Sequence, residues 1–278
     1  MSNKHTAASL LLGMILMGSA CAQEQLTNGN FESFTSNHVP TSWNFVAGDG
    51  SGSQVVGSSP FTNIYPTGNY SFQLSDDTGA TVTPWLQQSF NPQSGMLQVS
   101  FDFMVPTQYY GNTWAFLPTS STAGGYFSDL LIGGSNQTFS LQDASGVVNI
   151  TALASNTWYQ VTTTLDLNNF TYSGSISSFG GGALDTHTWS GRSLYSTTGN
   201  LALSPQLASL LFSDQPQAGT NNPIDLDNFS VMPATTAVPE PSGTILGFVG
   251  MALLGLLRGR GRKVWGGRSA VLSGWGLF

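Results

Sequence analysis

The amino-acid sequence predicts an all-β fold, in which two antiparallel sheets pack face to face as a jelly-roll sandwich. Short apolar runs alternate with polar positions, turn residues such as Asn, Asp and Gly separate the runs, and helical spacing of apolar residues is nearly absent. Side chains alternate between the two faces of a strand, so this pattern is typical of strands that bury one face. An N-terminal signal peptide and a single C-terminal transmembrane helix are expected to flank this body.

Two segments show the alternation most clearly. Residues 96–105 place apolar side chains at every second position from Leu97 to Val105, and residues 158–167 repeat the pattern from Tyr159 to Leu167. Eight shorter runs are weaker strand candidates: 71–74, 85–90, 129–132, 138–141, 147–150, 170–176, 208–213 and 224–231. Ten strands joined by Asn, Asp and Gly turns are enough for two packed sheets.

The first 22 residues have the three parts of a secretory signal peptide. Lys4 supplies the charged region, residues 7–17 are apolar, and Ala20-Cys21-Ala22 forms a small-residue cleavage site before Gln23. The expected partners are therefore the secretory translocon and signal peptidase. Cys21 leaves lipoprotein processing open as an alternative, although Gly18 stands where a lipobox usually has a large aliphatic residue. Cleavage after Ala22 would remove the only cysteine, so the mature chain could form no disulfide.

The expected β-sandwich domain, residues 23–232, is strongly acidic. Of the fourteen acids only Glu240 lies beyond it, and of the seven bases only Arg192 lies within it, which leaves a net charge near −12. Nucleic-acid binding depends on clustered Lys and Arg, so the composition excludes a nucleic-acid partner. The same composition favours solubility and permits calcium. Residues 233–237 are the expected linker to the tail.

The C-terminal tail combines a Pro-rich motif, an apolar segment and a basic cluster. Prolines fix φ and remove backbone donors, so the motif is expected to be a stiff, exposed peptide. Apolar residues 243–257 would form a helix about 22 Å long at about 1.5 Å per residue, which spans the hydrocarbon core of about 30 Å only marginally. The basic side chains would place this end in the cytoplasm. The motif residues are Val238, Pro239, Glu240, Pro241 and Ser242, and the basic residues are Arg258, Arg260, Arg262 and Lys263.

These three features in this order, across residues 238–263, closely resemble the PEP-CTERM sorting signal of exported bacterial proteins. The resemblance implies that a membrane protease-transpeptidase of the exosortase type processes the tail. An ordinary C-terminal anchor helix is the alternative. Residues 264–278 depart from the family pattern, because the family usually ends soon after the basic cluster, and this last segment is left unassigned.

Two motifs at the ends of the body resemble the galactose-binding-like carbohydrate modules. The opening motif runs from Leu26 to Glu32 with Trp43 shortly after, and the closing motif is residues 224–231. The first and last strands of such modules often lie side by side near a structural calcium, so the resemblance implies that Glu32 and Asp227 are calcium ligands. The alternative is that both residues make hydrogen bonds at strand ends. Residues 158–167 also resemble laminin-G-like and legume-lectin-like sandwiches.

A run of aromatic and amide residues follows the strand expected at 96–105. Tyr109, Tyr110, Asn112 and Trp114 are candidate ligand-binding residues, because sugar recognition needs aromatic faces for stacking and amides for hydroxyl groups. Trp85 and Gln87 are weaker candidates. The alternative is that the aromatic rings pack in the core or within the loop.

The sequence gives little support for enzyme chemistry, and we expect that the protein is not an enzyme. Beyond the signal peptide the only histidines are His38 and His187, and Asp185 with His187 is too small a set for a metal site. Arg192 is expected to neutralise a nearby acid such as Asp185. The sequence therefore predicts an exported protein, anchored in the inner membrane as a precursor, with a structural or adhesive role at the cell surface or in the extracellular matrix. A carbohydrate-binding module, with extracellular polysaccharide as the partner, and a secreted hydrolase are the alternatives.

Overall fold

The computed structural model describes twelve ranges of the body: residues 23–48, 50–57, 59–61, 69–76, 83–106, 113–120, 129–133, 136–143, 145–179, 185–194, 206–215 and 223–234. The chain divides into two units, Met1–Ala234 and Thr235–Phe278, and the second lies wholly outside these ranges. The expected signal peptide, the sorting motif at 238–242, the apolar segment 243–257 and the basic residues at 258–263 are therefore not described. Within the described ranges, no helix has the length and apolar character needed to cross a membrane.

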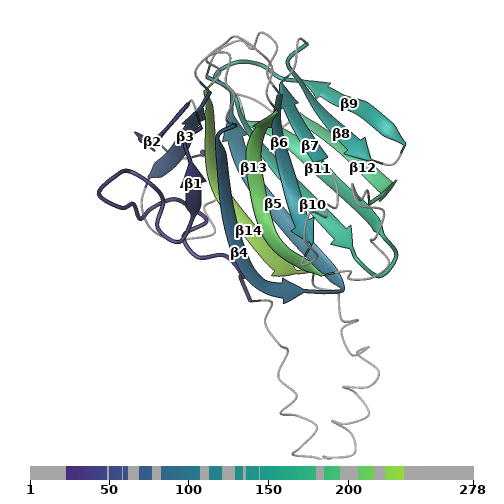
Figure 1. The fold of residues 1–278 in the computed structure, drawn as a ribbon. Helices are drawn as coiled ribbons and strands as arrows, with labels where there is room; N and C mark the ends of the chain where they lie inside the picture. The colour runs from purple at the N-terminus through teal and green to yellow at the C-terminus, as the bar shows by residue number, and fades with distance from the viewer. Residues whose placement is uncertain are drawn as a thin grey trace, which may run out of the picture. The chain divides into compact units, whose positions relative to one another are not determined.

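The described residues form two seven-stranded sheets in which every pairing is antiparallel. Figure 1 shows how the strands are arranged. The order in the first sheet is β1 (Asn44–Val46), β4 (Trp85–Gln93), β13 (Leu207–Gln215), β6 (Thr113–Ser120), β7 (Asp129–Gly133), β8 (Thr138–Asp143) and β9 (Gly146–Ala152). The order in the second sheet is β12 (Thr186–Ser193), β11 (Thr171–Phe179), β10 (Trp158–Asp166), β5 (Met96–Met104), β14 (Ile224–Pro233), β3 (Tyr70–Ser75) and β2 (Ser51–Val56). The predicted two-sheet sandwich is confirmed.

All ten strands expected from the sequence are present, and the structure adds β1, β2, β6 and β12. The most informative addition is β6, which contains Trp114 in a strand rather than in a loop. Its residues do not alternate, because Trp114 and Phe116 lie in the main core while Ala115 and Leu117 are buried in a second cluster on the other face. A strand covered on both faces reads as a continuous apolar run and gives no period-two signal.

The core between the sheets is mainly aromatic. Phe101 of β5 stacks on Phe229 of β14 at a centroid distance of 5.4 Å, and its ring lies 4.5 Å from that of Phe116 on β6. Trp114 stacks on Phe212 of β13 at 5.8 Å. Rings from both sheets therefore interlock, and each adds packing energy beyond the area that it buries.

A β-bulge in β14 determines which of its side chains face outward. Asp227 pairs with Asp102 of β5, but Ser230 pairs with Ser100, so β14 has one residue more than its partner between these positions. Asn228 takes up the extra residue in the left-handed region, with φ of 52°. Phe229 can thus point into the core while Asp227 and Ser230 share the outer face.

The segment after the expected cleavage site lies beside the last strand. The amide of Gln25 donates to the carbonyl of Val231 at 2.9 Å, and the amide of Phe229 donates to Gly29 at 2.8 Å. One carboxylate oxygen of Glu24 accepts from the Val231 amide at 2.8 Å, and the other accepts from the Ser230 hydroxyl. The first and last segments of the body are therefore neighbours, as the resemblance to galactose-binding-like modules implies.

Candidate functional site

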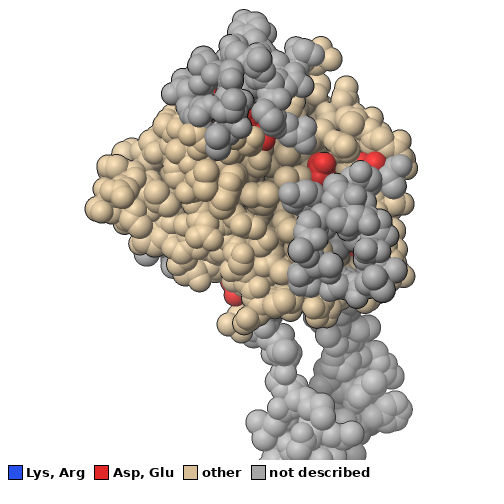
Figure 2. All heavy atoms as spheres, viewed as in Figure 1, with Lys and Arg blue, Asp and Glu red and all other residues tan. Residues whose placement is uncertain are grey.

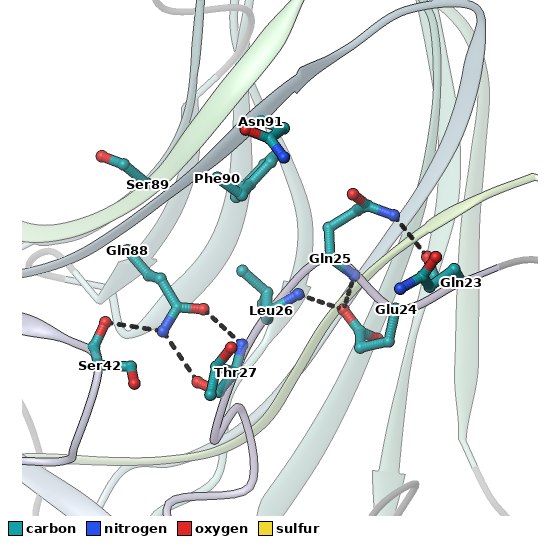
Figure 3. Close-up of a pocket in the computed structure, with 10 residues that line it drawn as sticks. All are labelled: Gln23, Glu24, Gln25, Leu26, Thr27, Ser42, Gln88, Ser89, Phe90 and Asn91. Atoms are coloured by element: carbon teal, nitrogen blue, oxygen red, sulfur yellow. Dashed lines mark hydrogen bonds between the residues drawn. The ribbon is translucent and has the colours of Figure 1, made fainter.

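An open polar pocket lies between the first segment of the body and β4, and Figure 3 shows its walls. Residues 23–27 form one wall and residues 88–91 the other, with Ser42 beside them. We call it the amide pocket, because four of these ten residues are Gln or Asn. Its volume is about 590 Å³. Pockets that bind small molecules commonly have volumes of about 300–1,000 Å³, so the amide pocket has room for a short oligosaccharide.

Two side chains with satisfied hydrogen bonds fix the walls of the amide pocket. The Gln88 amide accepts from the Thr27 N–H at 2.8 Å and donates to the carbonyls of Thr27 at 2.8 Å and Ser42 at 2.9 Å. Glu24 accepts from the backbone N–H groups of Gln25 and Leu26, both at 2.9 Å. The Gln88 contacts, drawn dashed in Figure 3, join β4 to segments far away in the sequence, whereas the Glu24 contacts shape the opening segment locally. The walls of the pocket are therefore formed before any ligand arrives.

The remaining polar groups of the amide pocket suit a neutral ligand. Ser89 and Asn91 are exposed, and Gln23 and Gln25 stand on the opposite wall. Hydroxyl and amide groups donate and accept hydrogen bonds without adding charge. The described surface in Figure 2 is likewise mostly uncharged, with some acidic atoms and no Lys or Arg in view. This arrangement is suited to hydroxyl-rich molecules rather than to anions.

Both residues expected to bind calcium belong to an acidic cluster on the outer face of the second sheet. Asp227 is fully buried, and its carboxylate accepts from the amides of Ser59 and Asn228, both at 2.8 Å. Asp102 pairs with Asp227 across the strands and accepts from the Asn228 side-chain amide at 2.8 Å. Glu32 accepts from the Tyr70 amide at 2.9 Å. The structure therefore brings Glu32 and Asp227 into one cluster, to which it adds Asp102.

Burial disfavours the ionised forms in this cluster. Burial is the main reason that the pKa of Asp227 rises to about 8; the Ser59 and Asn228 amides oppose this rise, and Asp102 and Glu32 add to it. Burial also raises the pKa of Asp102 to about 6 and the pKa of Glu32 above its usual value. Nearby carboxylates without a compensating cation repel one another, so a bound cation would relieve that repulsion.

The oxygen atoms of this cluster fit a calcium ion only in part. Three buried oxygens have no hydrogen-bond partner: Glu32 Oε2, Asp102 Oδ1 and Asn228 Oδ1. A Ca²⁺ ion is coordinated by six to eight oxygen atoms from carboxylates, carbonyls and water. Within the described residues, however, no three or more His, Cys, Asp or Glu side chains are arranged so that they could hold a metal ion. An ion at Glu32 and Asp227 would therefore need amide, backbone or water oxygens as further ligands.

The aromatic candidates do not form an exposed cluster in the described residues. Trp114 is fully buried in the core, and Tyr109, Tyr110 and Asn112 lie outside the described residues. Trp114 therefore stabilises the sandwich rather than presenting a ring to a ligand. The sequence signal missed this because an aromatic residue beside Gly and Asn resembles a loop residue, whereas the neighbouring strands bury it.

Arg192, the only Lys or Arg in the described ranges, pairs with Asp143 of β8 rather than with Asp185. The expectation that Arg192 neutralises an acid is confirmed, but the acid is not Asp185, because a bulge at Gly191, with φ of 61°, turns Arg192 to the same inner face as Trp189. Asp185 instead lies 3.3 Å from His187. The ion pair therefore joins the two sheets.

Comparisons with known proteins do not assign the chain to a family. No protein-family model matches the chain, and no curated protein matches it. Among solved structures, the chain is similar to a sialidase, with 13% identity, a TM-score of 0.44, and coverage of 71% of this chain and 17% of that one. The lectin UEA-II complexed with galactose shows 12% identity, a TM-score of 0.43, and coverage of 73% and 96%. The catalytic domain of a glycoside hydrolase family 131 protein from Coprinopsis cinerea shows 15% identity, a TM-score of 0.39, and coverage of 62% and 75%.

The expectation that the protein is not an enzyme is contradicted by these comparisons. Two catalytic domains of glycoside hydrolase family 131 are among the similar structures, together with the sialidase and lectins. The similar structures thus include both catalytic and binding proteins. The expectation rested on motifs of residues close together in the sequence, whereas the carboxylates of glycosidases come together only in space.

Proposed function

We propose that the protein is an exported, carbohydrate-binding β-sandwich with an adhesive or structural role at the cell surface or in the extracellular matrix. The amide pocket is the observation that supports this proposal best. Its hydrogen-bonded walls, its volume and its neutral hydroxyl and amide groups suit a short stretch of extracellular polysaccharide. The likeness to solved structures concerns the fold, so the proposal rests on the residues of this chain.

Ligand binding can be tested with a glycan array and a variant of the pocket wall. Ser89→Ala combined with Asn91→Ala removes two exposed polar groups and leaves the hydrogen bonds of Gln88 intact. We expect binding to weaken at least about tenfold, which corresponds to about 1.4 kcal/mol. Asn168→Ala, an exposed amide at the end of β10, is the control. Equal binding by the pocket variant and the parent protein would exclude this site.

The same glycans can decide between binding and hydrolysis. Each glycan that binds is incubated with the protein, and new reducing ends are measured. Binding without new reducing ends supports the proposed role. Release of reducing sugar would reassign the protein as a glycoside hydrolase, with the amide pocket then tested for substrate binding.

We propose that export and sorting depend on the two ends of the chain. The signal peptide at residues 1–22 would direct the chain to the translocon and signal peptidase. Val238, Pro239, Glu240, Pro241 and Ser242 would present a stiff recognition motif to an exosortase-type protease, while residues 243–257 and the basic cluster hold the precursor in the inner membrane. Mass spectrometry of the protein from its native host tests this proposal. A mature C-terminus upstream of residue 243 is expected, and an intact end at Phe278 would oppose it.

We also propose that Glu32 and Asp227 hold a structural calcium ion. The support is the set of buried oxygens without partners in the acidic cluster. A ligand that binds only the folded state must stabilise it, so calcium should raise the melting temperature and EDTA should lower it. Asp227→Asn is expected to abolish this difference, whereas Asp166→Asn, at the end of β10 and away from the acidic cluster, should preserve it. Identical melting curves in calcium and in EDTA would show that Glu32 and Asp227 do not bind calcium.

A further inference from the structure

The outer face of the second sheet carries an ordered array of hydroxyl groups. Strands β5, β10, β11 and β12 lie side by side there (Figure 1), and their outward positions are mostly Ser and Thr. We call this array the hydroxyl platform and define it by Ser100, Thr162, Thr164, Ser173, Ser175 and Thr188. The residues between them, such as Val161 and Leu165, point into the core and are fully buried.

The strand register aligns these hydroxyl groups in rows across the sheet. Ser100, Thr162, Ser175 and Thr188 are successive partners and form one row over four strands. Thr164 and Ser173 belong to the next row. Neighbours within a row are about 4.8 Å apart, and rows follow one another at about 6.7 Å along the strands. The hydroxyl platform is therefore a regular lattice rather than a random polar surface.

The hydroxyl platform is accessible and nearly uncharged. Five of its members are half-buried, and Thr188 on the edge strand β12 is exposed. The outward carboxylates on these strands are Asp102, which is buried, and Asp166, which is the last residue of β10 and accepts hydrogen bonds from the turn that follows. Arg192 points inward to Asp143. The described residues therefore offer no cation here for an acidic polymer, a nucleic acid or an anionic lipid.

Aromatic residues border one end of the lattice. Trp158 of β10 pairs with Phe179 of β11, and Phe179 is 46% exposed. The ring of Phe61 contacts that of Phe179 at 5.5 Å, which limits the movement of the exposed ring. Flat aromatic faces beside hydroxyl groups are the combination that pyranose rings require, because a sugar has both apolar faces and hydroxyl edges.

We infer that the hydroxyl platform is a second binding surface, which binds the face of an extended, neutral polysaccharide across β5, β10, β11 and β12. The inference rests on the proposed function for its ligand class, but it uses other residues than the amide pocket and a ligand of another shape. The pocket holds one short stretch of chain, whereas a lattice over four strands can contact several aligned chains. Each hydroxyl group contributes little binding free energy by itself, and the contributions of the rows add up when one ligand contacts them together.

Retention on insoluble polymers tests the hydroxyl platform directly. The full chain is incubated with microcrystalline cellulose and with chitin, and an acidic polymer bead such as pectate serves as the charged comparison. The platform variant combines Thr162→Val, Thr164→Val and Thr188→Val, since valine keeps the branched shape and β-propensity while removing the hydroxyl. Its control combines Thr119→Val, Thr138→Val and Thr151→Val on strands of the first sheet. Melting temperatures verify that both variants fold.

We expect retention on cellulose or chitin but not on pectate, and at least about tenfold weaker retention for the platform variant. The control and the amide-pocket variant should be retained like the parent chain. Equal retention of parent and platform variant would overturn the inference, and so would a lack of retention on both neutral polymers. A concentration-dependent dimer that the platform variant abolishes would also overturn it, because a second copy would then cover this face.

The two proposals fail in different ways. If soluble glycans do not bind but retention on polymers depends on the platform threonines, the proposed ligand site in the amide pocket is rejected and the hydroxyl platform is supported. If the pocket variant abolishes retention and the platform variant does not, a single site in the amide pocket explains all binding and the inference about the hydroxyl platform is rejected.

Discussion

At the residue scale, Asp129 at the start of β7 is a buried carboxyl whose Oδ1 has no hydrogen-bond partner. Burial raises its pKa from 3.8 to about 6. Asp143 and Arg192 lie near Tyr172, as Asp129 does, and Arg192 pairs with Asp143. Asp129 is therefore the carboxyl in this region whose ionisation is not offset by a cation.

This shift predicts that stability falls as pH rises. A pKa raised in the folded state means that Asp129 supports the fold fully below pH 3.8 and loses that support as pH passes through about 6. The loss would be about 3 kcal/mol for a shift of about two units. Urea unfolding at several pH values between 4 and 8 should show a smaller fall for Asp129→Asn than for the parent protein. Parallel curves for the two proteins would contradict the prediction.

The ion pair between Arg192 and Asp143 gives a second prediction at this scale. The Asp143 side chain is 1% exposed and that of Arg192 is 23% exposed, so loss of the arginine leaves a buried charge. Arg192→Met should lower the free energy of unfolding by about 3–5 kcal/mol. The double variant with Asp143→Leu should recover most of this loss, because it removes both charges. A double variant as unstable as the single one would show that packing, rather than charge, dominates.

At the element scale, β12 depends on two glycines for different reasons. Gly191 has φ of 61° and open space around its Cα, so its role is the backbone conformation of the bulge. Gly174 of β11 faces Trp189, and a Cβ there would lie 2.4 Å from the Thr162 carbonyl oxygen and 2.5 Å from the indole. The small side chain thus lets Trp189 pack directly on the β11 backbone.

Alanine at these two positions should therefore act through different mechanisms. Gly174→Ala should cost about 1–3 kcal/mol from overpacking against backbone that cannot move away. Gly191→Ala should cost about 1–2 kcal/mol from the left-handed conformation alone. At Gly174 the alanine would clash both with the Trp189 indole and with the Thr162 carbonyl. Adding Trp189→Ala to Gly174→Ala separates these two contributions, since it removes the indole clash and leaves the clash with Thr162. A Gly174→Ala variant as stable as the parent protein would refute the close approach.

At the scale of the whole molecule, the acidic composition should make stability depend on salt. The body has a net charge near −12, with Arg192 as its only base, so its carboxylates repel one another. Salt screens this repulsion over a Debye length of about 10 Å at 0.1 M. Sodium chloride at 0.5 M should raise the melting temperature by about 2–4 °C, the change that about 1 kcal/mol produces in a domain of this size. Potassium chloride should act equally, and a melting temperature that falls with salt would contradict the prediction.

The sequence by itself determined the strands that bury one face, and with them the all-β class. Alternation from Leu97 to Val105 and from Tyr159 to Leu167 is a local property, and each strand that shows it is present. The motifs around Glu32 and Asp227 also indicated that the two ends of the body meet.

Only the tertiary structure decided the rest, because it depends on partners distant in the chain. Because β6 is buried on both faces, Trp114 lies in the core. The bulge at Gly191 turns Arg192 inward, where it forms an ion pair with Asp143. The amide pocket and the hydroxyl platform likewise join residues from separate strands, whose register no local pattern contains.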